Sequence, residues 1–517
     1  MSVTGDRPPR GRRIWRGIPC AAASAFASFA TAEAHAHGFG QRYDLPVPLW
    51  LYLTGAGLTV ALSFVAMAVF LRARPAVRDV PGINLLNTRI GRVLAAAPLR
   101  FVLRLLGVLL YLLVVLAGLL GTQSPLKNIA PVMVWAIWWV GMAYVSALVG
   151  NVWALANPLD TLFVWLERPH ARARFGRRLS LELPYPKRLG VWPAVALFLA
   201  FIWIELVWES TDVPAKLALA ILAYSALTWL GMLVFGRHEW LRRGEVFAIV
   251  FGLLARFAPL EARTRDGRRE WNLRPYGIGL LTSEPLHASE ILLVILMLAT
   301  VSFDGFIETP AWAAIAEAMI GPAPEAGPGL TDALPTATGD ALVRTIGLIV
   351  APLLFLSVYL IVCELMVRYG APALLPSGAR YGGRPVARAA GLFVLTLIPI
   401  AIAYHLSHYL SFLVTAAQYL VPLASDPLGR GWDLFGGARY FIRIGIVDAR
   451  IVWYVSVAAI VAGHVAAVYL AHVLALREFP DRRVALRSQY PMLMLMVAYT
   501  MTSLWIIAQP IVSAGPR

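Results

Sequence analysis

The chain is poor in cysteine and in long polar segments. Its two cysteines are Cys20, in an amino-terminal segment that we expect to be removed, and Cys363, inside an apolar stretch. An intrachain disulfide in the mature protein is therefore excluded, and a cysteine-based metal cluster is not expected. The segments between apolar stretches reach only about thirty residues, too short for an independent core. Chemistry or transport must therefore take place among the apolar stretches or at their rim.

Other sequence features are missing as well. There is no nucleotide-binding motif of the GxxxxGK type. No internal repeat is evident, which weakens an inverted-repeat transporter without excluding it. From Pro275 to Val343 the chain contains no lysine or arginine, while acidic residues stand there among prolines and glycines. We expect the acidic part of this region to be an external loop.

Apolar residues make up 59% of the chain, and its mean hydropathy is +0.69. A soluble core would not bury that much apolar surface, whereas a bilayer does. We predict an all-α fold, a polytopic transmembrane helical bundle with about ten spans of roughly twenty residues or more. The predicted spans are Leu49–Arg72, Leu99–Gly121, Asn128–Ala154, Gly190–Trp208, Pro214–Gly236, Ala288–Ile307, Ala341–Arg368, Arg388–Val421, Arg450–Leu476 and Gln489–Val512.

The basic residues predict the orientation of these spans. Arginines follow the first span and the third, which places both loops in the cytoplasm. Alternation then puts the mature amino terminus outside, although the basic segment Gly429–Asp448 fits this scheme less well. The net charge of +16 comes mostly from the concentration of basic residues in the cytoplasmic loops, so a nucleic-acid partner is not needed to explain it.

Gly244–Leu260 is a shorter apolar stretch that contains Arg256. Basic loops flank it on both sides, so both of its ends are predicted to lie in the cytoplasm. A segment that enters and leaves on one side does not cross the membrane. We therefore predict one re-entrant or interfacial helix in addition to the spans.

Residues 1–36 are typical of a secretory signal peptide. Arginines precede a modest apolar run, and small residues around Ala34 and Ala36 offer cleavage sites. An uncleaved amino-terminal anchor is the alternative interpretation. Residues 37–517 are then predicted to form a single integral membrane helical domain.

The most informative polar groups are imidazoles inside predicted spans. His405 and His408 are three residues apart and lie on one face of a helix, and His464 lies at a similar depth in the following span. Neutral imidazoles bind zinc, copper or iron and also relay protons. We therefore predict a divalent transition metal, zinc or copper, held by His405, His408 and His464. The alternative is that each ring bonds a neighbouring carbonyl and joins two helices.

Carboxylates within spans are the other costly groups. Glu205 and Asp304 lie toward the outer ends of their spans, at a depth from which they can approach the imidazoles. Of the two, Asp304 is the predicted catalytic residue. Glu364 is predicted to pair with Arg368 at a spacing of four residues, a structural role.

Several strings carry a family resemblance. They are Ala36-His37-Gly38-Phe39-Gly40, Tyr43-Asp44-Leu45-Pro46-Val47-Pro48, Phe303-Asp304-Gly305-Phe306 and Arg487-Ser488-Gln489-Tyr490-Pro491. With these motifs the chain resembles, from the signal region to its carboxyl terminus, the fenitrothion hydrolase family of bacterial polytopic membrane proteins. The family's motifs have no assigned catalytic roles, so the resemblance supplies a reaction and no site. It also implies residence in the bacterial inner membrane.

The resemblance implies hydrolysis of a phosphorothioate triester, an apolar substrate that partitions into lipid, by an enzyme that needs a second hydrolase subunit. A metal held by the imidazoles would activate a water that Asp304 positions or deprotonates. Soluble phosphotriesterases place their metal on a barrel, and nothing comparable is expected in this all-helical chain.

Two other classes of function are consistent with the sequence. In a transporter of metal ions, or one coupled to protons, the same imidazoles would coordinate a passing ion or relay protons. In a non-catalytic subunit, the bundle would anchor a partner enzyme in the bilayer.

Overall fold

The structure is a computed structural model. It describes residues 43–71, 82–173, 179–265, 267–281, 284–320, 336–370, 385–479 and 481–511. The predicted signal peptide, with Cys20 and the Ala36–Gly40 string, lies outside the described residues. The described part is an all-α bundle with ten helical segments long and apolar enough to cross a membrane.

Eight of these segments each contain one long helix. They are α2 (Leu49–Phe70), α4 (Ala97–Leu120), α9 (Trp192–Leu206), α10 (Pro214–Phe235), α13 (Ala288–Ile307), α15 (Thr336–Tyr369), α19 (Ala449–Glu478) and α20 (Arg482–Ile511). The other two segments, which correspond to the predicted third and eighth spans, are interrupted. The prediction of ten spans is confirmed, with ends that differ by a few residues.

Helix ends follow local sequence signals. Proline stands in the first turn of α4, α9 and α10, where its missing N–H costs no hydrogen bond. Gly236 ends α10 with φ of 86°, a conformation that L side chains rarely adopt. Asn157 accepts the backbone N–H groups of Leu159 and Asp160 at the start of α8 (Pro158–Ala173), the capping role expected of an Asn-Pro pair.

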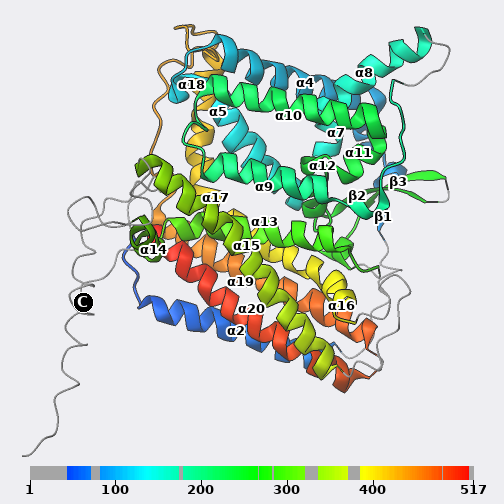
Figure 1. The fold of residues 1–517 in the computed structure, drawn as a ribbon, viewed down its shortest axis with the longest axis vertical. Helices are drawn as coiled ribbons and strands as arrows, with labels where there is room; N and C mark the ends of the chain where they lie inside the picture. Colours follow the sequence, from blue (N-terminus) through cyan, green and yellow to red (C-terminus); the bar gives the residue numbers. More distant parts are fainter. Residues whose placement is uncertain are drawn as a thin grey trace, which may run out of the picture.

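The long helices lie roughly parallel and form two groups (Figure 1). One group contains α2, α15, α19 and α20. Helix α20 contacts the other three, and α2 also contacts α19. The other contains α4 and α10 with several shorter helices. Helix α13 contacts α9 on one side and α15 on the other, so it joins the two groups.

The third span departs from regular α-helix in its middle part. It consists of α5 (Ile129–Pro131), the π-helical η5 (Val132–Gly141) and α6 (Met142–Leu148). π-Helical turns are uncommon and are often found at functional sites. Here the π-helical segment contains Trp139, which faces the cavity described below.

The eighth span is interrupted as well. Helix α16 (Pro385–Phe393) passes through the 3₁₀ turn η10 (Val394–Leu397) into α17 (Ile398–Gln418), and α18 (Leu420–Ser425) follows. Pro399 in the first turn of α17 lacks the N–H that a continuous helix would need, which accounts for the interruption.

The predicted re-entrant stretch, Gly244–Leu260, follows the short helix α11 (Arg237–Arg243) and forms α12 (Val246–Ala255). At 1.5 Å per residue, α12 spans about 15 Å, half the thickness of a bilayer core. Its apolar side chains are mostly buried against α6, α7 (Trp153–Ala156) and α9. It is therefore a short helix within the bundle and does not add a span.

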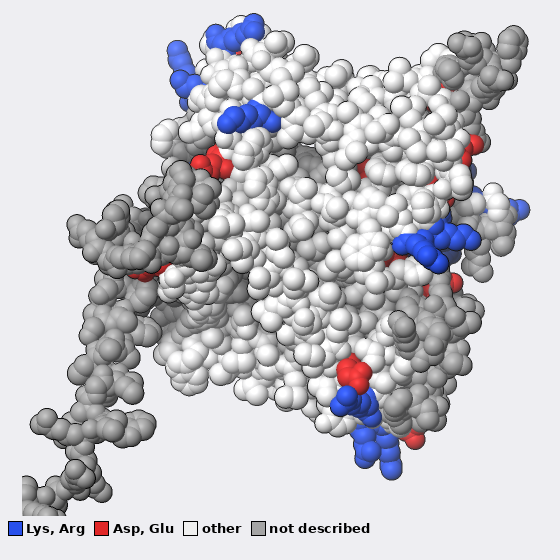
Figure 2. Space-filling view, in the orientation of Figure 1, with Lys and Arg blue, Asp and Glu red and all other residues white. Residues whose placement is uncertain are grey.

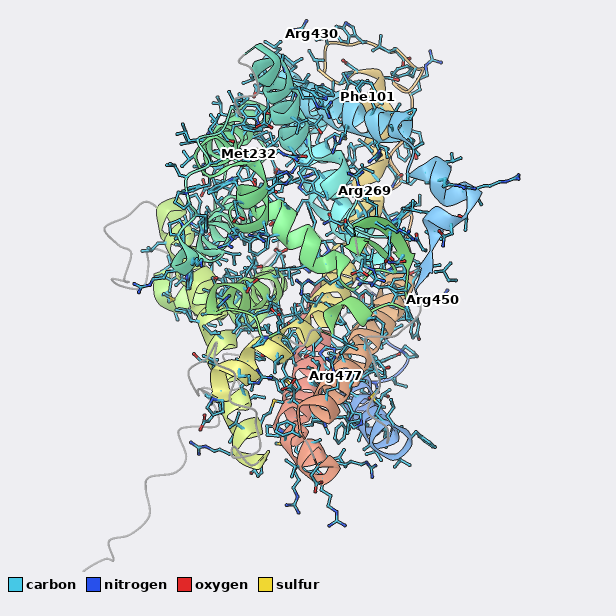
Figure 3. The ribbon with its side chains drawn as sticks, turned by 90° about the vertical axis from the view of Figure 1, so that its right-hand side faces the viewer. Phe101, Met232, Arg269, Arg430, Arg450 and Arg477 are labelled. Carbon is cyan, nitrogen blue, oxygen red and sulfur yellow. The ribbon has the colours of Figure 1, made fainter. Side chains whose placement is uncertain are left out.

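A small antiparallel sheet, which the sequence did not predict, follows α12. It contains β1 (Ile83–Asn84), β2 (Leu260–Arg265) and β3 (Arg268–Leu273), in the order β1-β3-β2. We call the end of the bundle that carries these strands the sheet end; Figure 3 views the molecule from this side. Helix α14 (Pro310–Ile320) lies at the opposite end (Figure 1).

The flanks of the bundle suit a lipid environment. Large apolar side chains of α2, α4 and α15 are exposed, among them Leu62, Leu120 and Leu354. Figure 2 shows a flank with few charged side chains, and most of the blue and red atoms lie toward its edges. Exposed apolar surface of this extent is costly in water and favourable in a bilayer.

Helices α17 and α19 approach closely at one glycine. A Cβ atom added to Gly463 would lie 2.5 Å from the Cβ of Ala403 and 2.8 Å from the carbonyl oxygen of Pro399. Small residues at such crossings let helix backbones pack tightly in membranes. Because Gly463 faces α17, the next residue, His464, points to a different side of α19.

This contact generates the first prediction. Gly463→Ala inserts a methyl group against rigid atoms and should destabilise the bundle by about 1–3 kcal/mol. The matched control is Gly55→Ala, because no atom lies within 4 Å of a Cβ at Gly55. The thermal unfolding midpoint in detergent, followed by tryptophan fluorescence, should fall for Gly463→Ala and not for Gly55→Ala. Equal midpoints would contradict the assigned contact.

Candidate functional site

A narrow cavity lies where the two helix groups meet. Its volume is about 40 Å³, enough for a few water molecules. Segments η5, α6, α9, α12, α13 and α17 all contribute to its wall, and no lysine or arginine is among the lining residues. Its polar side chains include Glu205, Asp304, His405 and Tyr409.

Asp304 on α13 is the centre of the polar cluster. Its carboxylate lies 2.9 Å from Nε2 of His408 and accepts a hydrogen bond of 2.5 Å from the Tyr409 hydroxyl. The Asp304 side chain is buried. Gly305 leaves room for this arrangement, because a Cβ there would lie 2.7 Å from the Tyr404 hydroxyl and 3.6 Å from Nδ1 of His408.

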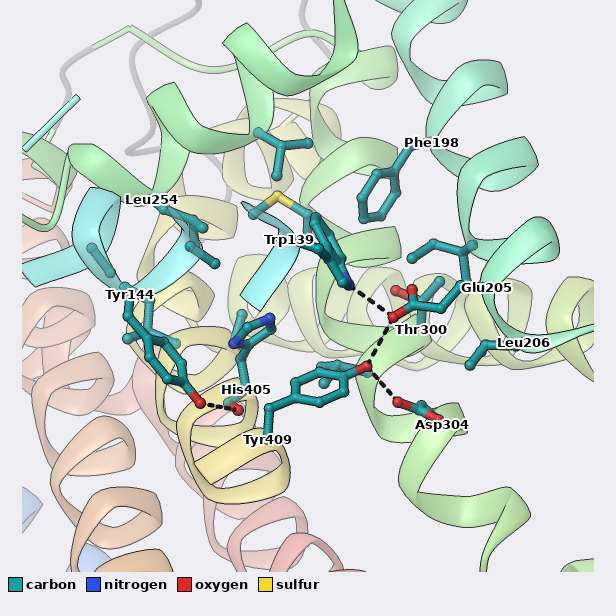
Figure 4. Close-up of a pocket in the computed structure, with 18 residues that line it drawn as sticks. Trp139, Tyr144, Phe198, Glu205, Leu206, Leu254, Thr300, Asp304, His405 and Tyr409 are labelled. Carbon is teal, nitrogen blue, oxygen red and sulfur yellow. Dashed lines mark hydrogen bonds between the residues drawn. The ribbon is translucent and has the colours of Figure 1, made fainter. Parts of the chain in front are cut away.

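Glu205 on α9 joins the cluster from the other helix group. Its Oε1 atom accepts a hydrogen bond of 2.8 Å from Nε1 of Trp139 and lies 3.4 Å from the Tyr409 hydroxyl (Figure 4). One hydroxyl has one proton, and the shorter distance assigns it to Asp304. A hydrogen bond between Tyr409 and Glu205 then requires a proton on the Glu205 carboxyl group. The Tyr409 oxygen thus connects two carboxyl groups from different helices.

The His405 ring lies in the cavity wall among aromatic side chains. It contacts Trp139, Tyr144 and Tyr409 at ring-centroid distances of 6.0, 5.3 and 4.8 Å. Both of its ring nitrogens are buried without a hydrogen-bond partner among the described residues. A buried polar group of this kind is costly unless something binds it, so the ring is available to water or to a ligand in the cavity.

His464 lies apart from this cluster. Its Nδ1 is 2.8 Å from the carbonyl oxygen of Ile460, one turn earlier in α19, and its ring lies 5.7 Å from that of Tyr499 on α20. His472 makes a comparable packing contact, with Nδ1 3.0 Å from Oε1 of Gln489. These two imidazoles therefore take part in the contact between α19 and α20.

The structure brings Asp304, His405 and His408 to one region and does not bring His464 to them. Among the described residues, no group of three or more histidine, cysteine, aspartate or glutamate side chains is placed to hold a metal ion. The described side chains therefore do not fit a centre with three protein ligands. A bound zinc or copper ion stays a prediction.

Asp304, His405 and His408 of this region were predicted from the sequence. The other members, Glu205, Tyr409 and Trp139, were not predicted as site residues. Depth along the span did place Glu205 near the imidazoles, but depth does not tell which way a side chain faces. The structural role predicted for Glu364 is confirmed, since its carboxylate pairs with Nε of Arg368 at 2.8 Å.

A second buried carboxyl group, Glu245, begins α12. It accepts the backbone N–H groups of Phe247 and Ala248 and the hydroxyl of Tyr224. Burial raises the pKa of Glu245 above its ordinary value, and these hydrogen bonds offset part of the effect. The group caps a helix in an apolar environment and stands apart from the cavity lining.

Removing the Tyr409 hydroxyl tests the cluster. Tyr409→Phe leaves Asp304 without a short hydrogen bond and should destabilise the protein by about 1–3 kcal/mol. The matched control is Tyr404→Phe on the same helix, since the Tyr404 hydroxyl is buried without a partner among the described residues. The thermal unfolding midpoint should fall only for Tyr409→Phe. A fall of the same size in both variants would contradict the hydrogen-bond assignment.

Glu245 predicts a pH effect on stability. The folded chain binds this proton more tightly than the unfolded chain, so its contribution to the free energy of unfolding falls as pH rises above about 4.5 toward the raised pKa. Glu245→Gln should remove this slope. Unfolding midpoints of both proteins across this range measure it, and parallel profiles would refute the role of Glu245.

Comparisons with known proteins add no identification: no family model matches the chain, and neither a curated protein nor a solved structure matches it.

Proposed function

We propose that this integral membrane protein is a proton-coupled transporter whose protonation site is the cluster of Glu205, Asp304, His408 and Tyr409. The observation that carries the proposal is the Tyr409 hydroxyl placed between the two carboxyl groups, 2.5 Å from Asp304 and 3.4 Å from Glu205. Intramembrane carboxyl and imidazole groups in contact are typical of proton relays.

The balance of charge in the cluster is the physical reason to expect that it binds protons. With both carboxylates ionised and His408 neutral, the cluster has two negative charges in a cavity lined by no lysine or arginine. Isolated charges are very costly in an apolar interior. The cluster becomes neutral when it binds two protons, for example one on His408 beside Asp304 and one on Glu205. Proton binding and release are therefore the chemistry for which these side chains are placed.

The size of the cavity indicates that the transported species is small. A volume of about 40 Å³ holds water or a small ion, and the unpartnered nitrogens of His405 face the space in which such a cargo would bind. A cation bound there would compete with protons for the same carboxyl groups, which is how the two fluxes become coupled. Metal ions of the class predicted from the imidazoles are the first cargo to test.

The location forms part of the proposal. The sheet end carries the basic loops that include Arg92 and Arg242, which by the positive-inside rule favours a cytoplasmic position for this end. The membrane itself, the bacterial inner membrane, is the one that the family resemblance implies. Glu205 and Asp304 then lie toward the outer ends of α9 and α13.

Reconstituted vesicles test the transporter. Protein in liposomes with a trapped pH-sensitive dye should take up protons under an imposed inside-negative potential, measured without metal and with added zinc or copper ions. Glu205→Gln and Asp304→Asn should each slow the flux by about tenfold or more, because each removes a protonatable group. Glu364→Gln is the matched control, since its carboxylate pairs with Arg368 near the sheet end. Fluxes no greater than in empty liposomes under all conditions would refute the proposal.

The hydrolase implied by the family resemblance is the second candidate. It is favoured by the pairing of His408 with Asp304 at 2.9 Å near an apolar cavity, since such a pair is able to take a proton from an attacking water. The cavity would have to widen greatly to admit a triester. Purified protein should then release nitrophenol from fenitrothion in detergent, without a sealed vesicle. If release appears only when the product of a neighbouring gene is added, the chain is a membrane subunit of a larger enzyme.

A further inference from the structure

A second, larger cleft lies at the sheet end of the bundle. Its volume is about 330 Å³, and it is bounded by the segment before α9, by α11, by the residue after α12 and by the start of α13. Four cationic side chains line it: Lys187, Arg242, Arg243 and Arg256. They come from three separate segments of the chain, so the fold itself brings them together.

Two of the cations already have partners. Arg242 and Arg243 pair with Glu239 at 2.6 and 3.0 Å, and the Arg243 guanidinium also lies over the ring of Tyr185. These contacts hold one wall of the cleft in place. Lys187 and Arg256 form no ion pair or side-chain hydrogen bond with the described residues.

The environment of Arg256 indicates which kind of ligand the cleft would bind. It is half-buried, and burial lowers the pKa of its guanidinium while the nearby charge of Glu290 raises it. The Glu290 carboxylate is engaged elsewhere, because it accepts the backbone N–H of His287 at 2.9 Å. A half-buried guanidinium with five donors and no bonded acceptor favours an anion with several oxygens.

The electrostatics of the cleft agree with an anionic ligand. Glu284 and Glu290 also line it, but the four cations outnumber these two carboxylates, and they still outnumber them when Glu239 is included. The start of α13 adds the positive end of a helix dipole to the same space. Basic clefts between helices on the cytoplasmic side of membrane proteins are suited to phosphate head groups.

We propose that this cleft binds a phosphate group, which Lys187 and Arg256 contact together. The group belongs either to a phospholipid head group or to a soluble phosphate compound. The two carboxylates that line the cleft, Glu284 and Glu290, would in addition suit an amine attached to the same ligand, as in an aminophospholipid. The cleft is separate from the cavity around Asp304, so the inference is independent of proton transport.

A phosphate group bound in this cleft would affect α9 and α13, the helices that carry Glu205 and Asp304. The Ser289 hydroxyl accepts the backbone N–H of Val191 at 3.1 Å and so ties the start of α13 to the start of α9. Glu205 and Asp304 lie near the other ends of these helices. A phosphate group held between Lys187 and Arg256 would brace both starting points.

Binding to purified full-length protein tests the inference. Inorganic phosphate, compared with sodium chloride at equal ionic strength, should raise the thermal unfolding midpoint. Native mass spectrometry of the same preparation should reveal any retained phospholipid. A shift with phosphate indicates a soluble phosphate ligand; a retained phospholipid with no shift until it is removed indicates a head group. Either result supports the phosphate site.

Variants assign the site to these residues. Lys187→Gln and Arg256→Gln should each weaken phosphate binding by about tenfold, because each removes a charged hydrogen-bond donor. Lys187 is exposed, so its substitution tests the site even if Arg256→Gln folds poorly. Arg368→Gln, whose guanidinium pairs with Glu364, is the matched control and should bind as the wild type does. The inference is overturned if the wild type binds neither phosphate nor phospholipid, or if Lys187→Gln binds either as tightly as the control does.

Discussion

The cost of placing two carboxyl groups in an apolar interior is the constraint on which this structure depends. Glu205 and Asp304 come from different helices and meet at a single tyrosine hydroxyl, next to one imidazole, in a cavity whose lining residues include no lysine or arginine. Such a cluster is tolerable only if its charge is balanced by protons. Under the proposed function, this cluster binds and releases protons when its charge changes.

Departures from regular α-helix lie beside this cluster. The π-helical η5 carries Trp139, the donor to Glu205, and the 3₁₀ turn before α17 precedes the helix that carries His405, His408 and Tyr409. Both breaks occur in the spans that line the cavity, whereas α2, α4 and α10 contribute no lining residues. Irregular backbone inside a membrane protein is expected where it lines a cavity, and its position here supports a role for the cavity in function.

The sequence was sufficient for the ten spans and for half of the site, but not for the small sheet beside α12. Runs of apolar residues gave the spans, and basic flanks gave the short helix α12, because both are properties that a bilayer selects directly. His464 could not be placed in the same way. It has the depth of the other imidazoles, but Gly463 turns toward Ala403 on α17, so the next side chain faces α20. The facing of Glu205 toward Tyr409 likewise follows from helix packing, which one sequence does not reveal.

Infrared difference spectroscopy of the carboxyl groups tests the central claim most directly. At neutral pH the protein should give a band from a protonated carboxyl group in an apolar environment. Glu205→Gln should remove this band in a Glu245→Gln background, in which the buried carboxyl group of Glu245, with its raised pKa, is absent, since charge balance assigns one of the two protons to Glu205 when the other resides on His408 beside Asp304. Asp304→Asn should leave His408 without its partner and alter the same band. A spectrum that stays unchanged in Glu205→Gln would mean that Glu205 carries no proton at neutral pH, and would contradict the account.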